Sequence, residues 1–222
     1  MRGYAKELER YEMDNTNAKS FTFAVKRILD IFLSLWGLVL LSPLLCILSI
    51  LILIESGAPV LFIQQRAGRN GKPFGILKFR TMIPDAVKVG LGLRTCEDDP
   101  RVTRIGKFMR EYHLDELPQI INVIKGDMSI VGPRPTILSQ VETYAPFERR
   151  RLEVRPGITG LAQVSGNNAL SWEERIRLDV YYVDNVSLPM DVNIILRTFS
   201  TVANKEGIYG EDGMVHDKGE HA

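Results

Sequence analysis

The longest apolar stretch of the chain runs from Ile31 to Ile54 without a charged residue. As a helix it would be about 36 Å long, enough to cross a hydrocarbon core of about 30 Å. Ser42 and Pro43 lie at its middle, where proline removes a backbone hydrogen bond and clashes with the preceding turn. The two halves could dip into a membrane and return, but the residues alone favour a kinked spanning helix, because neighbouring groups can compensate for a kink.

The distribution of charge divides the chain into four parts. Residues 1–25 form a polar lead-in, residues 26–55 the membrane helix, residues 56–205 a cytosolic domain and residues 206–222 a flexible tail. Basic residues flank the apolar run on both sides, whereas a spanning helix usually has them on one side. These flanking residues are Lys26, Arg27, Arg66, Arg69 and Lys72. The run begins too late for a signal peptide, and no cleavage site follows it.

Within the cytosolic domain, short apolar runs predict strands and repeats near 3.6 residues predict helices. The expected elements are strands over residues 60–63 and 74–82, helices over 102–112, 115–126, 171–183 and 189–204, and a loop with a short strand over 154–166. Ser171 to Glu174 form a capping box. The last helix carries an apolar stripe, which either packs in a core or lies at a membrane interface. The pattern predicts a small domain of mixed α and β structure.

Asp115 and Glu116 are the first candidates for chemistry. Pro118 is tolerated only in a first helical turn, so the helix is expected to begin around Asp115 and to end at Gly126. The positive end of a helix dipole stabilises a carboxylate and attracts phosphate, so Asp115 could attack phosphorus. The simpler interpretation is that Asp115 only caps the helix.

Basic residues near this stretch could hold phosphates. Lys78 and Arg80 share one face of a predicted strand, where they could bind a diphosphate or simply be solvated. Arg134 stands between two prolines, which suits a rigid phosphate clamp, although the sequence could also be a plain turn. The basic run 149–151 could meet anionic lipid or water. The acidic run 97–99 is most simply a solvated turn, with a metal site as the alternative.

Composition narrows the class of protein. The 222 residues include 28 basic and 27 acidic side chains, a balance that gives no indication of nucleic-acid binding. The two cysteines have neither metal-ligand spacing nor a disulfide framework, which fits a reducing compartment. The glycine-rich fingerprints of nucleotide-binding loops are absent.

A series of ordered motifs resembles the bacterial sugar transferases called monotopic phosphoglycosyl transferases, particularly the small PglC-like members. The motifs are Lys26-Arg27 with Asp30, Ser42-Pro43, Lys78 to Met82, Asp99 to Arg101, Leu114 to Gln119, Gly126 to Ser129, Gly132 to Pro135 and Arg155 to Gly160. The resemblance covers roughly residues 24 to 205. It implies an α/β fold with a re-entrant helix-break-helix at Ser42 and Pro43, and several amphipathic helices at the membrane interface.

The resemblance also implies roles for residues. Asp115 would be the nucleophile, and Glu116 would help to bind Mg²⁺. The phosphates would be surrounded by Lys78, Arg80, Arg110 and Arg134. His113 stands where the family usually has a small hydroxyl residue, which leaves a role of its imidazole in proton transfer open.

By the same resemblance, the enzyme would move a sugar phosphate from a UDP-sugar, with N-acetylated amino sugars among the candidates, to undecaprenyl phosphate and release UMP. It would act at the cytoplasmic face of the bacterial inner membrane, in contact with its lipid, and a homodimer is open. The alternatives are a metal-dependent glycosyltransferase that releases UDP, for which no D-x-D motif is found, and a non-enzymatic lipid-binding scaffold.

Overall fold

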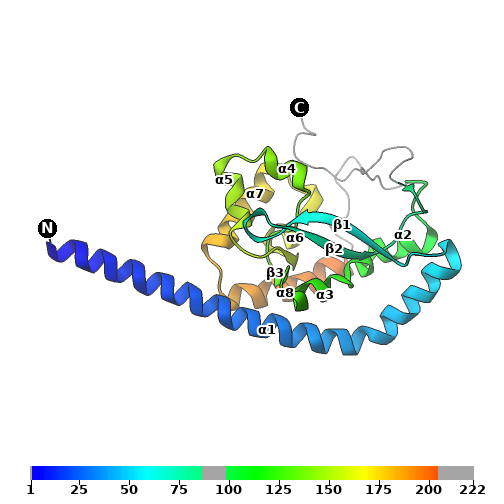
Figure 1. The fold of residues 1–222 in the computed structure, drawn as a ribbon, viewed down its shortest axis with the longest axis horizontal. Helices are drawn as coiled ribbons and strands as arrows, with labels where there is room; N and C mark the ends of the chain where they lie inside the picture. Colours follow the sequence, from blue (N-terminus) through cyan, green and yellow to red (C-terminus); the bar gives the residue numbers. More distant parts are fainter. Residues whose placement is uncertain (1, 87–98, 205–222) are drawn as a thin grey trace.

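The computed structural model describes residues 2–86 and 99–204, with side chains described from residue 20 onward. Its dominant element is α1 (Arg2–Ser56), a helix of 55 residues. Figure 1 shows α1 running beneath the other elements and bending upward in its second half, toward the first strand. Within the described residues, one segment, Ser20–Ser56, is long and apolar enough to cross a membrane. The predicted tail over 206–222 lies outside the described residues.

The break expected at Ser42 and Pro43 is instead a bend in a continuous helix. The helix passes through Pro43 without an interruption. The Ser42 hydroxyl donates a 2.8 Å hydrogen bond to the carbonyl of Val39, and such side-chain bonds, like proline itself, bend helices without ending them. The lead-in of residues 1–25 is also helical from Arg2 and continues directly into the apolar part.

The two faces of α1 differ in exposure. Lys26, Asp30 and Ser34 are buried at helical spacing on the inner face, and Leu48 and Ile52 follow on it. The outer face leaves large apolar side chains exposed, among them Phe21, Ile28, Phe32, Trp36, Val39, Leu40, Ile47, Ile50 and Ile54. A continuous apolar surface of this extent is unfavourable in water and supports association with a membrane.

Both ends of the apolar run are fixed to the same folded unit. Near its start, Lys26 Nζ lies 2.5 Å from Asp191 Oδ2, and both residues are buried. Near its end, the Glu55 carboxylate accepts hydrogen bonds from two backbone N–H groups at the start of α2 (Arg104–Glu111). Both ends of the apolar run are therefore bound to the domain formed by the rest of the chain.

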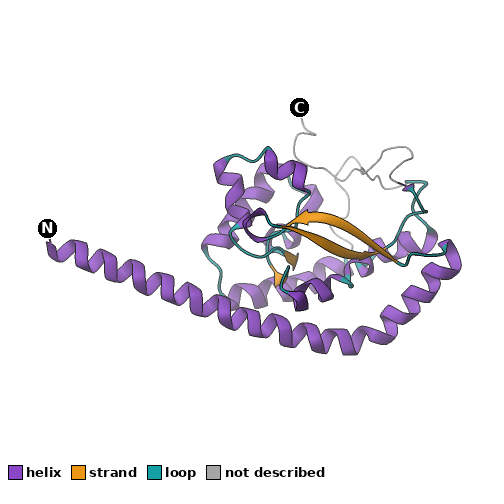
Figure 2. Cartoon of the chain, in the orientation of Figure 1, coloured by secondary structure: helices purple, strands orange, loops and turns teal. Residues whose placement is uncertain are grey.

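The two longer strands form an antiparallel hairpin. β1 (Leu61–Ala67) pairs with β2 (Pro73–Phe79) around the turn η1 (Arg69–Gly71). Figure 2 shows this hairpin lying across the helices that follow it. Both strands were predicted, but β2 ends at Phe79 and not at Met82.

The next stretch leads from α2 into two short segments. α2 confirms the helix predicted over 102–112. It is followed by the 3-10 turn η3 (Leu114–Glu116) and by α3 (Gln119–Lys125).

The prediction of one helix over 115–126 was therefore wrong at its start. Asp115 and Glu116 lie in η3, and α3 begins only after Pro118. The predicted end is confirmed, because Gly126 caps α3 with a left-handed φ of 99°, a conformation that glycine adopts without a steric cost.

Two short strands join the middle of the chain to its last third. β3 (Ser129–Val131) pairs in parallel with β4 (Gly157–Thr159), which lies in the predicted loop-and-strand region. A Cβ atom on Gly157 would lie only 2.1 Å from the backbone nitrogen of Gly132. The close approach of these two loops therefore requires glycine.

Helices complete the domain. They are α4 (Leu138–Glu142), α5 (Pro146–Arg149), η4 (Arg150–Leu152), α6 (Leu161–Val164), η5 (Asn167–Ala169), α7 (Trp172–Asp184) and α8 (Leu188–Ala203). The predicted capping box of α7 is confirmed. The predicted apolar stripe of α8 is divided, because Ile194 is buried whereas Phe199 is exposed.

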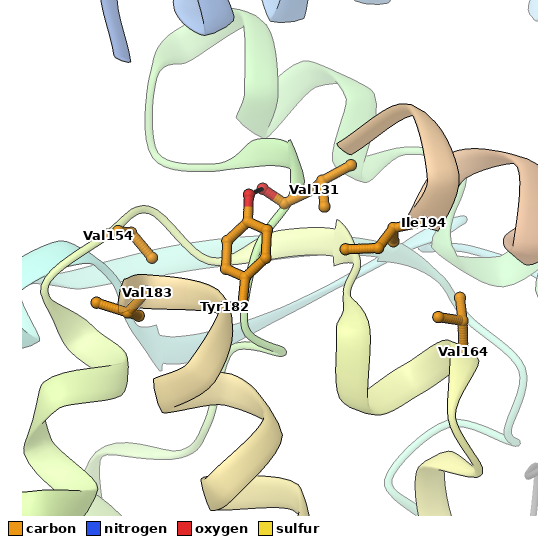
Figure 3. Packing of buried hydrophobic residues seen from close by; sticks show 6 residues of the cluster. All are labelled: Val131, Val154, Val164, Tyr182, Val183 and Ile194. Atoms are coloured by element: carbon orange, nitrogen blue, oxygen red, sulfur yellow. Dashed lines mark hydrogen bonds between the residues drawn. The ribbon is translucent and has the colours of Figure 1, made fainter. Parts of the chain in front are cut away.

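Of the three apolar clusters among the described residues, two hold α1 and the C-terminal helices in place. One is formed by Val131, Val154, Val164, Tyr182, Val183 and Ile194, which converge in Figure 3. The other joins Leu48 and Ile52 of α1 to Phe79 of β2 and Met109 of α2. The membrane helix therefore supplies part of the core beneath β2 and α2.

Candidate active site

Asp115 and Glu116 lie where η3 packs against both α2 and β2. Glu116 is buried and Asp115 is half-buried. The turn begins after His113, whose φ of 53° is left-handed and therefore unfavourable for a non-glycine residue. Burial lowers the pKa of the His113 imidazole, while the charge of Glu116 opposes that shift. This favours the neutral imidazole beside the two carboxylates.

Glu116 is held between two cations. Lys78 Nζ lies 2.6 Å from its Oε1, and Arg134 donates through Nη2 to Oε1 at 2.8 Å and through Nη1 to Oε2 at 3.3 Å. Burial alone would raise the pKa of Glu116, but the charges of Arg134 and Lys78 outweigh it and hold the pKa well below its usual range. Glu116 is therefore ionised, with both oxygens engaged.

Asp115 has the opposite environment. Among the described residues none donates a hydrogen bond to its carboxylate. Burial raises its pKa, and the adjacent charge of Glu116 acts in the same direction, while Lys78 and Arg110 act against them. Two neighbouring carboxylates with pKa values displaced in opposite directions are typical of an active site. A weakly solvated carboxylate without partners is available as a nucleophile.

Arg110 lies near Asp115 of the carboxylate pair Asp115 and Glu116, which we call the dyad. Its Nε donates a 2.9 Å hydrogen bond to the hydroxyl of Thr81, and its charge lowers the pKa of Asp115. The structure therefore brings together Asp115, Glu116, Lys78, Arg110 and Arg134.

Arg80 is placed differently. Its Nη2 donates to the backbone carbonyls of Ser56 and Gly57, at 2.9 and 2.5 Å, and thereby caps the C-terminal end of α1. Lys78 and Arg80 were expected on one face of a strand, but β2 ends at Phe79, so Arg80 lies beyond the strand. The Nε and Nη1 atoms of Arg80 are buried without a partner.

The acidic run at 97–99 is only partly described. Asp99 is buried and pairs with Arg101, whose Nη2 lies 2.6 Å from Asp99 Oδ2. The charged hydrogen bonds from Arg101 lower the pKa of Asp99 despite its burial. Asp99 therefore has a structural role, in place of the solvated turn or metal site considered from the sequence. Glu97 and Asp98 lie outside the described residues.

Two positioning residues were not anticipated. Asn122 is buried in α3 and bonds to the edge of β2, accepting from Leu77 N at 2.9 Å and donating to Gly75 O at 2.8 Å. It fixes the strand that carries Lys78 against the helix that follows the dyad. In the sequence, Asn122 stands one helical turn after Gln119, which could have indicated a buried polar contact. A polar residue at that spacing is, however, equally typical of an exposed helix face.

Arg151 is the second such residue. It is buried, pairs with Asp179 at 2.6 Å and donates a 3.0 Å hydrogen bond from Nη2 to the backbone carbonyl of Arg134. Burial opposes its charge, yet Asp179 and Tyr144 raise the pKa of Arg151. The basic run 149–151 was interpreted as a lipid-facing or solvated surface, which is wrong for Arg151.

The donor set of the dyad suits a hard cation. Mg²⁺ in phosphate chemistry commonly uses one or two carboxylates together with substrate oxygens. Two adjacent carboxylates, one of them free of hydrogen-bond donors, fit that requirement. In residues 20–86 and 99–204, no three acidic, histidine or cysteine side chains are arranged so that they could hold a metal ion, so a cation would also need oxygen from substrate or water.

Comparison with known proteins assigns this geometry to a family. The sequence model described as bacterial sugar transferase matches residues 21–205, which is most of the chain and contains all the residues gathered around the dyad. The chain belongs to the bacterial sugar transferase family. The resemblance inferred from the motifs is confirmed.

Individual relatives support this assignment. The chain is 41% identical over 184 residues to the uncharacterized sugar transferase EpsL of Bacillus subtilis, covering 83% of this chain and 90% of that protein. It is 36% identical over 220 residues to the undecaprenyl-phosphate galactose phosphotransferase of Salmonella typhimurium, covering 93% of this chain and 46% of that protein. An N-acetylgalactosaminephosphotransferase of Aeromonas hydrophila is 42% identical over 184 residues, covering 80% of this chain and 43% of that protein. This bacterial sugar transferase thus spans less than half of some relatives.

Proposed function

We propose that this chain is a phosphoglycosyl transferase that moves a sugar 1-phosphate from a UDP-sugar to undecaprenyl phosphate and releases UMP. The observation that carries the proposal is the dyad, in which Asp115 is free of hydrogen-bond donors while Glu116 is engaged by Lys78 and Arg134. Relatives named as undecaprenyl-phosphate sugar phosphotransferases support the substrate class. The product would be the first lipid-linked sugar of a polysaccharide or other glycoconjugate.

In the first step an oxygen of Asp115 attacks the phosphorus that carries the sugar. The new bond joins this oxygen to phosphorus, and the bond from phosphorus to the bridging oxygen breaks, so that UMP leaves with the electron pair. Lys78, Arg110 and Arg134 would pair with the phosphate oxygens. When substrate arrives, its phosphates would share the cations that bind Glu116 in the free protein.

In the second step the phosphate of the polyprenol attacks the same phosphorus. The bond between phosphorus and the Asp115 oxygen breaks, which restores the carboxylate and yields a polyprenyl diphosphate sugar. Division into two steps allows a water-soluble donor and a membrane-held acceptor to use one nucleophile in turn. The site therefore does not need to hold both substrates at once.

Magnesium fits the donor set, and Glu116 with Asp115 would hold it together with the donor's diphosphate. When bound, the ion would neutralise charge on the transferring phosphoryl group. Glu116 would also keep Lys78 and Arg134 in place.

We place the site at the cytoplasmic face of the inner membrane. Because Lys26 and Glu55 fasten the two ends of the apolar run to one folded unit, the bent α1 enters the membrane and returns to the same side, as a monotopic anchor would. The exposed apolar residues of α8, Val192, Leu196 and Phe199, would lie at the interface.

The test is to identify the released nucleotide. Purified protein with Mg²⁺, undecaprenyl phosphate and a panel of UDP-sugars is expected to release UMP with at least one sugar. Without acceptor, intact-mass analysis should find one phosphosugar added to the chain, at Asp115 after digestion. Release of UDP would instead indicate a glycosyltransferase, and binding without turnover on any donor would indicate a scaffold.

A further inference from the structure

A shallow recess lies at the opposite end of α3 from the dyad. Its lining includes Arg27, Arg69 and Arg155. Arg27 donates to the carbonyls of Val123 and Ile124 near the C-terminal end of α3, at 2.7 and 3.0 Å. Since the dyad precedes the first residue of α3, roughly 15 Å of mostly helical chain separates the two places.

Three arginines of this recess have no carboxylate partner. Arg69 donates through Nε to the carbonyl of Glu153, and Arg155 donates through Nε to the carbonyl of Gly126, each at 2.9 Å. Arg27 likewise binds only carbonyls. Within the described part of the chain, none of the three forms an ion pair. Buried or clustered arginines normally have an anionic partner.

Asp30, which lines the recess, and Asp191, which pairs with the lining residue Lys26, do not balance this charge. Asp191 is taken by Lys26, and Asp30 accepts hydrogen bonds from the Ser129 hydroxyl and from a backbone N–H. Burial lowers the pKa of Arg155, and the charges of Arg27 and Arg69 lower it further against the opposing charge of Asp30. The arginines therefore repel one another, and an added anion would relieve that repulsion.

The recess borders the part of α1 that directly precedes the apolar run. Lys26, Arg27 and Asp30 stand immediately before Ile31, where the uncharged stretch begins. On the same turns of α1, the side chain of Ile28 is 68% exposed. This combination of exposed apolar and basic side chains is expected at the depth of lipid headgroups.

We propose that this recess binds the phosphate group of an anionic phospholipid. A phosphodiester offers oxygens to the planar forks of Arg69 and Arg155, whose terminal nitrogens have no acceptor within the described residues. A zwitterionic headgroup would bring its own cation toward the arginines and is disfavoured. The bound lipid would join the start of the anchor to the β4 region without taking part in the transfer.

Native mass spectrometry of the full chain, released from neutral detergent, tests this site. With phosphatidylglycerol and phosphatidylcholine at equal amounts, wild-type protein is expected to retain one phosphatidylglycerol. Arg69→Gln and Arg155→Gln should each lower that retention by about fivefold. Arg177→Gln removes an exposed arginine of α7 that does not line the recess, and should leave retention unchanged.

Several results would overturn the assignment. Equal retention of the two lipids, or wild-type retention in Arg69→Gln, would exclude a selective site here. Protection against thermal unfolding by inorganic phosphate alone, without lipid retention, would indicate a free-anion site. Complete displacement of phosphatidylglycerol by undecaprenyl phosphate would assign the recess to the acceptor. Arg69 is exposed and makes one hydrogen bond, so its variant is expected to fold even if Arg155→Gln does not.

Discussion

The buried pair of Arg151 and Asp179 allows two roles of Arg151 to be tested separately, namely positioning Arg134 and stabilising the fold. The two side chains are 6% and 3% exposed and their charged atoms lie 2.6 Å apart. Arg151→Met alone would leave the Asp179 carboxylate buried without a partner, at a cost of about 3–5 kcal/mol in the free energy of unfolding. Arg151→Met combined with Asp179→Leu removes both charges, which is typically neutral or stabilising.

The double variant still lacks the hydrogen bond that Arg151 donates to the carbonyl of Arg134. A hydrogen bond from a charged donor contributes on the order of 1.5–3 kcal/mol. If that contribution holds the Arg134 guanidinium where the phosphates bind, its loss should slow turnover by roughly 10- to 100-fold. The double variant is therefore expected to unfold at the wild-type temperature or above it, yet to be slow.

The assay is thermal unfolding in detergent beside UMP release under saturating donor and acceptor. Arg150→Met is the matched control, because Arg150 is a neighbour whose ion pair with Asp184 is exposed and contributes little. Stable protein with wild-type turnover in the double variant would refute the positioning role, since the charge pair would then serve the fold alone.

Three further predictions follow from the site and the anchor. Asp115→Asn should abolish both the phosphosugar adduct and turnover, because a neutral amide does not attack phosphorus. A residue that only capped the turn would tolerate Asn. Intact-mass analysis and UMP release distinguish the two cases. Single cysteines at Ser20 and Asn70, in a chain whose Cys46 and Cys96 have been replaced, should react with impermeant reagent only from the cytoplasmic side, and labelling of position 20 from outside would contradict the returning anchor. The folded-state pKa of Glu116 is depressed, so its stabilising contribution should be fully present above the unfolded pKa near 4.5 and be lost as pH falls from there toward the folded-state pKa. The difference in unfolding temperature between wild type and Glu116→Gln should therefore shrink below pH 4.5. A difference that stays constant from about pH 6 to about pH 3 would argue against the ion pairs.

The sequence was informative where one local rule decides the structure. The capping box at Ser171 and the left-handed end at Gly126 both follow from short-range chemistry, and both are confirmed. Asp115 and Glu116 were singled out because they were expected at a helix start, and the structure brings them together with Lys78, Arg110 and Arg134, while their catalytic role stays a prediction. The start of α3 was missed, because a proline such as Pro118 is compatible both with a first helical turn and with the residue that precedes it.

Long-range contacts explain the other differences. Arg80 and Arg151 look like surface cations in the sequence, and only the fold shows that one caps α1 while the other pairs with Asp179, 28 positions further along. The bend at Pro43 agrees with the kink that the residues alone favoured, whereas the fastening of both ends of the apolar run to one folded unit depends on distant residues that no local pattern contains. Residues whose partners are distant in sequence were therefore those whose surroundings the sequence did not show.

The second apolar cluster has a consequence for how the protein matures. Leu48 and Ile52 of α1 pack against Phe79 of β2 and Met109 of α2, which are the sequence neighbours of Lys78 and Arg110. A shortened protein without α1 would open this core and leave the start of α2 without the Glu55 carboxylate. In the proposed function, insertion of the anchor and assembly of Lys78 and Arg110 beside the dyad would therefore be coupled, so newly made chains would gain activity only on arrival at the lipid bilayer that holds their acceptor.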